Sequence, residues 1–318
     1  MTQMPSISII MPAYNCERFL PATLDSLLSQ TVADWECVIV DDGSKDGTAI
    51  VAEAYANQDA RIRLFRQPNG GPSAARNHGF RERHPSSKYV TFMDSDDVYL
   101  PDSLSILRTE LENNPQSIGA HGLADFIDED GRPFKPGEYA DRGRQRLGFN
   151  GKRLVQWNLS LPTCFDILMN GNVLFPPGLI LTRKEFYEKA GPFDETFRAA
   201  EDWDMLIRLS RFGDFQFINR VILLYRRHSS NLGAMHGVAE QAWRVRCKAF
   251  FSADNSKAQQ QKAKGGWKAY QLYMIDQRLL TVKNDIANRR YLAAISGCVR
   301  VPVHVYRYVR GYPTPVVR

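Results

Sequence analysis

Three aspartates crowd together where an apolar run of residues ends. The stretch YVTFMDSDDVYLP places Asp94, Asp96 and Asp97 directly after the run Tyr89–Met93. Carboxylates so close repel one another and raise each other's pKa unless a cation or hydrogen-bond donors compensate. Mg²⁺ usually binds through one or two carboxylates together with substrate phosphates, and Mn²⁺ favours similar oxygen ligands. The cluster is therefore a candidate metal and diphosphate site, with an acidic turn before a helix near Asp102 as the alternative.

A second polar stretch, DDGSKDG, follows the apolar run ECVIV. Asp42 in this stretch is a candidate acceptor for a ring N–H group of a nucleobase. Asp, Gly and Ser are also good turn formers, and Ser44 or Asp46 could instead cap the next helix.

A glycine-rich turn, NGGPSAARN, opens a helix that carries Arg76. Backbone amides at a helix start favour anions, and an arginine there can bind phosphate through two N–H groups. The turn is not a Walker sequence, and no GxGxxG motif follows the first apolar run. Both observations count against nucleoside triphosphatases and dinucleotide-binding enzymes.

Three further candidate residues, Glu201, Asp202 and His228, lie late in the chain. Glu201 and Asp202 open a helical pattern, where acids are common because they stabilise a helix N-terminus. In the functional interpretation Asp202 is a general base, which the helix N-terminus would keep ionised. His228 follows an apolar run in a polar setting, as a candidate ligand of metal or diphosphate or as a structural histidine.

The elements that must position these residues alternate between strands and helices. Nearly continuous apolar runs of this kind suit parallel strands buried on both faces, and helical periodicity separates them. The pattern predicts a doubly wound, mostly parallel α/β sheet, whose ligands bind outside the carboxyl ends of the strands. The expected strands are Ser6–Met11, Glu36–Val40, Ile62–Phe65 and Tyr89–Met93.

The second half of the chain is less regular. From about Gly119 to Asn170 the sequence is polar and glycine-rich, which predicts loops. Order returns with a strand at Pro177–Thr182, a helix at Glu201–Arg211 and a strand at Phe217–Tyr225. Beyond Gly237 the chain is expected to be helical, with a break at the glycine pair 265–266.

The net charge of +6 is concentrated at the C-terminal end. From Arg278 to Arg318 there are seven arginines and Lys283 against Asp285, so 8 − 1 = +7, and the first 277 residues sum to −1. A nearly neutral body argues against a protein that reads duplex DNA. The basic, tyrosine-containing tail suits either an anionic membrane face or a solvated helix with a disordered end.

Other general features point to a protein of the reducing cytoplasm. The five cysteines are scattered without CxxC spacing, which argues against a disulfide framework or a zinc site. The N-terminal MTQMPSISIIM lacks the basic region of a signal peptide, and no apolar run reaches the roughly 18 residues that span a bilayer.

Taken together, the order and spacing of these motifs resemble one family. The series SIIMPAYN, VIVDDGSKDGT, NGGPSAARN, YVTFMDSDDVYLP, GPFDETF…EDWDMLIRL and LLYRRH is similar to the inverting family 2 nucleotide-sugar glycosyltransferases, which have the GT-A fold. The similarity covers about residues 5–230. It implies a GT-A domain at 1–235, with a donor-binding half at about 5–118 and an acceptor half at about 119–235, and a basic helical extension at 236–318.

The resemblance also implies roles for single residues. Asp202 corresponds to the catalytic base and Glu201 to a neighbour that positions substrate. Asp96 corresponds to the metal ligand, and His228 to a metal or diphosphate contact found in some members. The residues implied to bind the nucleotide-sugar are Pro12, Ala13, Tyr14, Asp42, Arg76, Asp94 and Ser95.

The implied reaction is metal-dependent transfer of a sugar, with Mn²⁺ or Mg²⁺, from a nucleoside-diphosphate sugar to a hydroxyl group. UDP is the expected carrier because an Asp42-type contact suits uracil, and GDP and dTDP donors are the alternatives. The acceptor would be a glycan or a lipid-linked glycan, with no nucleic-acid partner, and the enzyme would be cytoplasmic or peripheral on the cytoplasmic membrane face. The alternatives are a nucleotidyltransferase, whose basic loop after the first strand is missing here, and a non-catalytic nucleotide-sugar-binding module.

Overall fold

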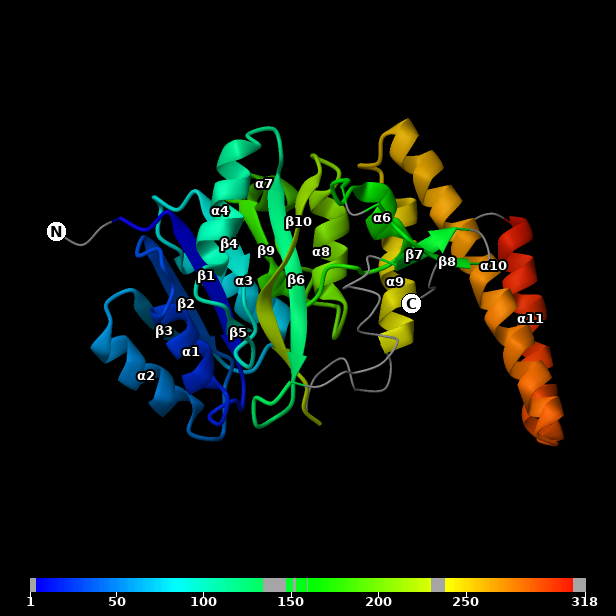
Figure 1. Ribbon diagram of the computed structural model, residues 1–318, viewed down its shortest axis with the longest axis horizontal. Helices are drawn as coiled ribbons and strands as arrows, with labels where there is room; N and C mark the ends of the chain where they lie inside the picture. Colours follow the sequence, from blue (N-terminus) through cyan, green and yellow to red (C-terminus); the bar gives the residue numbers. More distant parts are fainter. Residues whose placement is uncertain (1–3, 134–146, 151–152, 159, 230–237, 311–318) are drawn as a thin grey trace.

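Eight strands form the sheet at the centre of the protein (Figure 1). The computed structural model describes residues 4–133, 147–150, 153–158, 160–229 and 238–310. The strands follow the order β3-β2-β1-β4-β9-β6-β10-β5, and β7 and β8 form a separate hairpin. Their bounds are β1 Ile7–Ala13, β2 Trp35–Asp41, β3 Ile62–Arg66, β4 Tyr89–Phe92, β5 Val98–Tyr99, β6 Gly119–Ile127, β7 Leu147–Asn150, β8 Arg153–Gln156, β9 Ile180–Arg183 and β10 Phe215–Arg226.

The sheet is mostly parallel, as the sequence pattern predicts. Strand β1 pairs in parallel with β2 and with β4, and β2 pairs in parallel with β3. Strands β6 and β10 form a second parallel pair. Strand β9 runs antiparallel between β4 and β6 and so joins the two parallel groups. The four strands expected in the first half are confirmed.

Helices cover the sheet and extend beyond it. Because β1, β2 and β3 succeed one another in one direction, right-handed crossovers place α1 and α2 on one face, seen in front in Figure 1. The return from β3 to β4 places α3 on the opposite face. The helices are α1 Leu20–Leu28, α2 Thr48–Gln58, α3 Pro72–Glu82, α4 Ser103–Asn113, α6 Phe165–Asn170, η1 Pro177–Leu179, α7 Lys184–Ala190, α8 Glu201–Leu209, α9 Val238–Phe251, α10 Lys257–Ala287 and α11 Tyr291–Arg310.

Strand β6 corrects the prediction of loops from residue 119 onward. It lies inside the sheet between β9 and β10, although it contains two glycines. A Cβ atom on Gly119 would lie 2.6 Å from the ring of Phe215, and one on Gly122 would lie 2.8 Å from Ile222 Cγ1. The large side chains of β10 therefore require small residues in β6, which hides the strand from a search for apolar runs. The part of the predicted loop at 134–146 and 151–152 lies outside the described residues.

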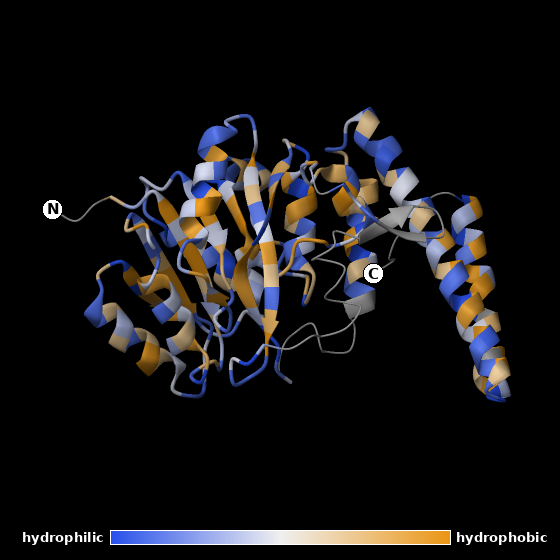
Figure 2. Ribbon diagram, in the orientation of Figure 1, coloured by the Kyte–Doolittle hydropathy of each residue, from blue (hydrophilic) through white to orange (hydrophobic). Residues whose placement is uncertain are grey.

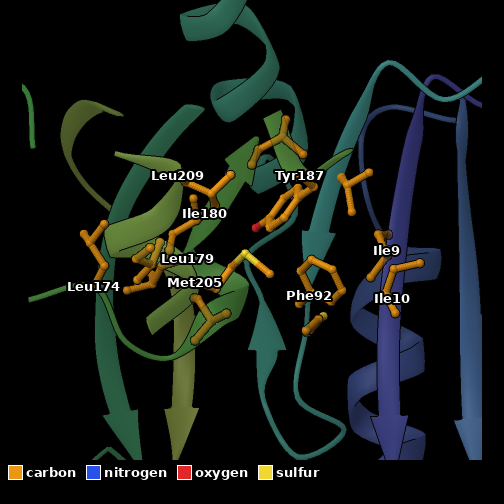
Figure 3. Close-up of a cluster of buried hydrophobic side chains, with 14 of the residues drawn as sticks. Ile9, Ile10, Phe92, Leu174, Leu179, Ile180, Tyr187, Met205 and Leu209 are labelled. Atoms are coloured by element: carbon orange, nitrogen blue, oxygen red, sulfur yellow. The ribbon is translucent and has the colours of Figure 1, made fainter. Parts of the chain in front are cut away.

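The hydrophobic core is continuous across β9 (Figure 3). Apolar residues concentrate along the strands of the sheet (Figure 2). On one side of β9, Phe92 of β4 packs edge-on against Tyr187 of α7, with 5.0 Å between ring centroids. Met205 and Leu209 of α8 belong to the same cluster. Helix α8 is thus held in a fixed position relative to the end of β4.

The C-terminal helices form a hairpin that projects from the body (Figure 1). Helix α10 begins with a capping box in which Ser256 and Gln259 bond each other's backbone N–H groups. It then runs without interruption to Ala287, so the predicted break at residues 265–266 is wrong. Its contacts with α6, α9 and α11, among them Lys262 with Asp166, Trp267 with Trp243 and Gln271 with His304, outweigh the weak helix propensity of the glycine pair.

Candidate active site

The carboxyl ends of β1, β2 and β4 bring the predicted site residues to one rim. Ala13 pairs with Asp41 across the β1–β2 ladder, and its carbonyl oxygen accepts a hydrogen bond from the backbone N–H of Asp42 at 2.8 Å. The loop after β1 is tied to the loop after β2, because Asn15 N–H donates to Ser44 Oγ at 3.0 Å. Pro12 is half-buried and Ala13 is buried, whereas Tyr14 is exposed on this rim.

Asp42 organises the glycine-rich turn. Its Oδ1 accepts hydrogen bonds from Gln67 Nε2 and from Gly70 N–H, each at 2.8 Å. Its Oδ2 accepts from Gly71 N–H at 2.8 Å. The residue is buried, so a nucleobase N–H would have to share a carboxylate that already holds the turn in place. This structural role of Asp42 is not visible in the sequence, because its partners lie 25 to 29 residues away.

The three aspartates after β4 point to different partners. One oxygen each of Asp94, Asp96 and Asp97 lies within 4.8 Å of the others. Asp96 Oδ2 lies 2.7 Å from His228 Nε2, and the histidine ring stacks on Phe19. The neighbouring Ser95 is buried and its carbonyl oxygen accepts a hydrogen bond from the side chain of α1 residue Thr23.

Asp97 is the buried member of the cluster. Its Oδ1 accepts a hydrogen bond from the backbone N–H of Arg226 at 3.1 Å, and its Oδ2 has no hydrogen-bond partner among the described residues. Burial, followed by the charges of Asp96 and Asp94, raises the pKa of Asp97 well above its usual value. The Arg226 side chain also binds the cluster, since its Nε donates to the carbonyl oxygen of Asp96 at 2.9 Å.

Arg76 joins the acid cluster to the start of α8. Its guanidinium donates to Asp94 Oδ1 at 2.7 Å and to Glu201 Oε1 at 2.5 Å. The arginine side chain is only 4% exposed, so this is a buried ion-pair network. Burial is the main cause that raises the pKa of Asp94 to about 6. The positive charge of Arg76 opposes this shift, and the negative charge of Asp96 adds to it.

Asp202 lies in the first turn of α8, next to this network. The helix begins after Ala200, whose φ of 62° turns the chain into the helix. Asp202 Oδ1 accepts from the N–H of Trp203 at 2.7 Å, and its Oδ2 accepts from Asn172 Nδ2 at 3.3 Å. Burial is the main cause that raises the pKa of Asp202 to about 7; Glu201 adds to the shift, and Arg76 opposes it. A carboxylate with such a pKa is suited to take a proton near neutral pH.

The residues present fit a divalent cation. Closely spaced carboxylate oxygens with one imidazole nitrogen are ligands for Mn²⁺, and Mg²⁺ prefers the oxygens. The buried Oδ2 of Asp97 has no hydrogen-bond partner within the described part of the chain, which is a further sign that positive charge completes the cluster. Asp96 and His228, which already contact each other, would hold such an ion, with Asp94 beside them.

The structure therefore brings together most of the residues predicted for chemistry. Asp94, Asp96 and His228 lie in one cluster, and Arg76 links it to Glu201 beside Asp202. Sequence reasoning missed the other partners of these groups. Arg226 could have been found two positions before His228 in YRRH, but Asn172 and Phe19 carry no distinctive signal of their own.

The sequence matches a known family. The chain matches Glycosyl transferase family 2 over residues 8–189, more than half of its length, and it belongs to that family. Uncharacterized glycosyltransferase EpsJ of Bacillus subtilis (strain 168) is 31% identical over 233 residues, which are 72% of this chain and 63% of EpsJ. Chondroitin synthase of Escherichia coli is 29% identical over 231 residues, covering 72% of this chain and 30% of the synthase. The chain thus spans less than two thirds of the length of both relatives.

Solved structures agree with the fold. S. aureus TarS 1–349 in complex with UDP-GlcNAc superimposes with a TM-score of 0.63 at 17% identity, covering 96% of this chain and 81% of that one. Mannosyltransferase PcManGT from Pyrobaculum calidifontis, in complex with GDP-Man and Mn²⁺, gives a TM-score of 0.58 at 16% identity, covering 94% of this chain and 88% of that one. The expected α/β fold of GT-A type with C-terminal helices is confirmed. Among the described residues, no helix has both the length and the apolar character that crossing a membrane requires.

Proposed function

We propose that this protein transfers a sugar, with inversion, from a UDP-sugar to a hydroxyl group of a glycan or lipid-linked acceptor. The observation that carries the proposal is the buried bridge of Arg76 between Asp94 and Glu201. This bridge holds two parts of the site in fixed relative positions: the aspartate cluster, which is the candidate metal and diphosphate site, and helix α8, which carries Asp202. A donor held at the cluster would therefore meet a base whose position is already set.

Asp202 performs the proton transfer. The acceptor hydroxyl oxygen attacks the anomeric carbon and forms the new C–O bond, while its proton passes to the Asp202 carboxylate. The bond between the anomeric carbon and the diphosphate oxygen breaks, and the nucleoside diphosphate leaves with that electron pair. Asn172 and the N–H of Trp203 hold the carboxylate in one orientation during this step.

Donor binding belongs to the rim formed by the first half of the chain, about 5–118. Pro12, Ala13 and Tyr14 border the nucleoside, with Tyr14 exposed and able to stack on the base. Asp42 reads the uracil N–H through its remaining lone pairs. Asp94 contacts the donor, and Mn²⁺ or Mg²⁺ at Asp96 and His228 would neutralise charge that develops on the leaving diphosphate.

The acceptor would lie on the other half, about 119–235, beside Asp202. The relatives and structural neighbours differ in donor and product, since they include a chondroitin synthase, a UDP-GlcNAc complex and a GDP-Man complex. The UDP assignment therefore rests on Asp42. The five cysteines are all free thiols, which supports a reducing, cytoplasmic location.

The test measures nucleoside diphosphate release and sugar transfer with Mn²⁺ present. Asp202→Asn keeps the shape of the side chain but removes the base, so transfer should fall by about 10²- to 10⁴-fold while donor affinity stays within a few-fold. Asp96→Ala should instead remove Mn²⁺-dependent donor binding. Near-normal turnover in the Asp202 variant would remove the base assignment, and absence of donor hydrolysis by the wild type would favour a non-catalytic binding module.

A further inference from the structure

The outer side of helix α11 carries a stripe of exposed apolar side chains. Leu292 is 85% exposed and Val309 is 74% exposed, at opposite ends of the helix. With Ile295, Val303 and Tyr306 between them, the spacings are 3, 8, 3 and 3 residues, which place all five on one side of a helix. We call these five residues the α11 stripe. Figure 2 shows apolar and polar residues alternating along this helix.

The opposite side of α11 packs against α10, so the stripe faces away from the rest of the protein. His304 Nδ1 lies 2.8 Å from Gln271 Oε1. A Cβ atom on Gly297 would lie 2.7 Å from Val282 Cγ2, which shows how closely the two helices approach. Gly297 and His304 stand about half a helical turn away from the stripe. The stripe is therefore not needed to hold the hairpin together.

The base of the hairpin is anchored in the body. Lys262 of α10 pairs with Asp166 of α6 at 2.9 Å. Trp267 packs edge-on against Trp243 of α9, with 4.8 Å between ring centroids, and its Nε1 donates to the carbonyl oxygen of Arg307. The hairpin is thus a fixed projection whose stripe is presented to the surroundings (Figure 1).

The hairpin is also strongly basic. Residues 278–310 contain seven basic side chains and one acid, so 7 − 1 = +6. The acid, Asp285, is already paired with Arg290 at 2.7 Å. Arg300 is exposed and flanks the α11 stripe on the helical projection, and exposed Lys283 lies on α10. Arg307 instead stacks on Trp243 of α9, with 4.0 Å between its guanidinium carbon and the ring centroid.

We propose that the α11 stripe and its flanking basic residues dock on an anionic lipid bilayer. An apolar stripe with basic residues beside it is the arrangement of helices that lie in the interface plane, with the apolar side in the acyl boundary and the cations among anionic headgroups. The positive charge of the hairpin favours an anionic bilayer, rather than a second copy of the chain, as the surface that covers the stripe. Two hairpins packed stripe to stripe would bring two net charges of the same sign together.

The experiment measures cosedimentation of the full chain with vesicles. Wild-type protein should bind vesicles of phosphatidylcholine mixed with phosphatidylglycerol, bind phosphatidylcholine vesicles weakly, and lose binding at high salt. The double substitution Leu292→Asp with Ile295→Asp should lower binding about tenfold or more, because it places charge at the acyl boundary. Ile50→Asp is the matched control, since Ile50 is an exposed apolar residue on α2, and it should bind as wild type does.

A second pair of variants tests whether basic residues of the hairpin contribute to binding anionic vesicles. Arg300→Glu should weaken binding to the anionic vesicles, whereas Lys88→Glu, an equal change of charge at an exposed residue of the body, should not. Absence of wild-type binding to anionic vesicles would overturn the proposal. So would a stable dimer without lipid that the double substitution separates, because a second copy would then cover the stripe. Donor hydrolysis is measured in parallel, and vesicle binding by a protein without hydrolysis would sink the proposed function alone.

Discussion

Charged side chains are buried and paired at the acid cluster, whereas they are exposed on the hairpin of α10 and α11. At the rim, Arg76 is buried and held by two acids from distant parts of the chain. On the hairpin, arginines and large apolar side chains are exposed side by side. Burying a charge costs free energy that only close partners offset, and exposing a row of apolar groups leaves hydrophobic free energy unused. The first region is therefore shaped by contacts within the protein, and the second by contacts outside it.

Arg76→Met should produce the largest loss of stability. It leaves Asp94 and Glu201 without their shared cation in a buried place, and breaking such a network typically costs about 3 to 5 kcal/mol of unfolding free energy. Chemical denaturation measures the loss. Arg132→Met is the control, because the Arg132–Asp130 pair is exposed and should contribute about 1 kcal/mol at most.

A second variant keeps this prediction testable if the methionine protein does not fold. Arg76→Lys retains the charge but cannot donate to both acids from a planar guanidinium. Its stability should fall between those of the wild type and Arg76→Met. Equal stability of all three proteins would show that the bridge does not couple the rim to α8.

The pH dependence of transfer should show the raised pKa of Asp202. A base must be ionised to accept a proton, so a pKa of about 7 predicts that the rate falls about tenfold for each pH unit below 7 and levels off above it. Measurement of kcat at saturating donor from pH 5 to 9 tests this. Asn172→Ala removes a hydrogen-bond donor to the ionised Asp202 carboxylate, so it should raise the pKa of Asp202 and shift the acidic part of the pH–rate profile to higher pH. A rate independent of pH below 7 would contradict the assignment.

Much of the rim follows from the sequence, because strand ends in a parallel sheet converge on one edge. Asp94 and Asp96 lie where the run Tyr89–Met93 predicts. The cross-links do not follow, since Arg76 and Glu201 are 125 residues apart and Asp96 and His228 are 132 apart. No local pattern encodes such pairs. A sequence-based interpretation therefore places Arg76 near the nucleotide without showing that it is a buried bridge.

The fold shows the same limit in β6 and α10. The small residues in β6 are explained by Phe215 and Ile222 of β10, and the uninterrupted α10 by its packing on α6, α9 and α11. The basic character of the C-terminal end is readable from composition. The α11 stripe is not readable in the same way, because exposure of Leu292 depends on which side of α11 packs against α10.

Asp97→Asn should stabilise the metal-free protein by a moderate amount. A raised pKa means that the folded state prefers protonated Asp97, so stability is lost as pH rises from about 4 through the folded pKa. Asparagine can still accept from Arg226 N–H but cannot ionise, so at pH 8 the variant should gain about 1 to 2 kcal/mol. Thermal unfolding in chelator at pH 4 and pH 8 measures it. A gain that is the same at both pH values would exclude ionisation of Asp97 as its cause.

Leu292→Gln should have the smallest effect on stability and would sharpen the contrast between the two regions. Because the side chain is 85% exposed, its removal should change the unfolding free energy by no more than about 0.5 kcal/mol. The control, Leu209→Ala in α8, removes a fully buried side chain and should cost about 2 to 5 kcal/mol. Chemical denaturation of both variants tests this pair. A large loss in Leu292→Gln would mean that the stripe serves the folding of the hairpin, and the difference between the two regions would disappear.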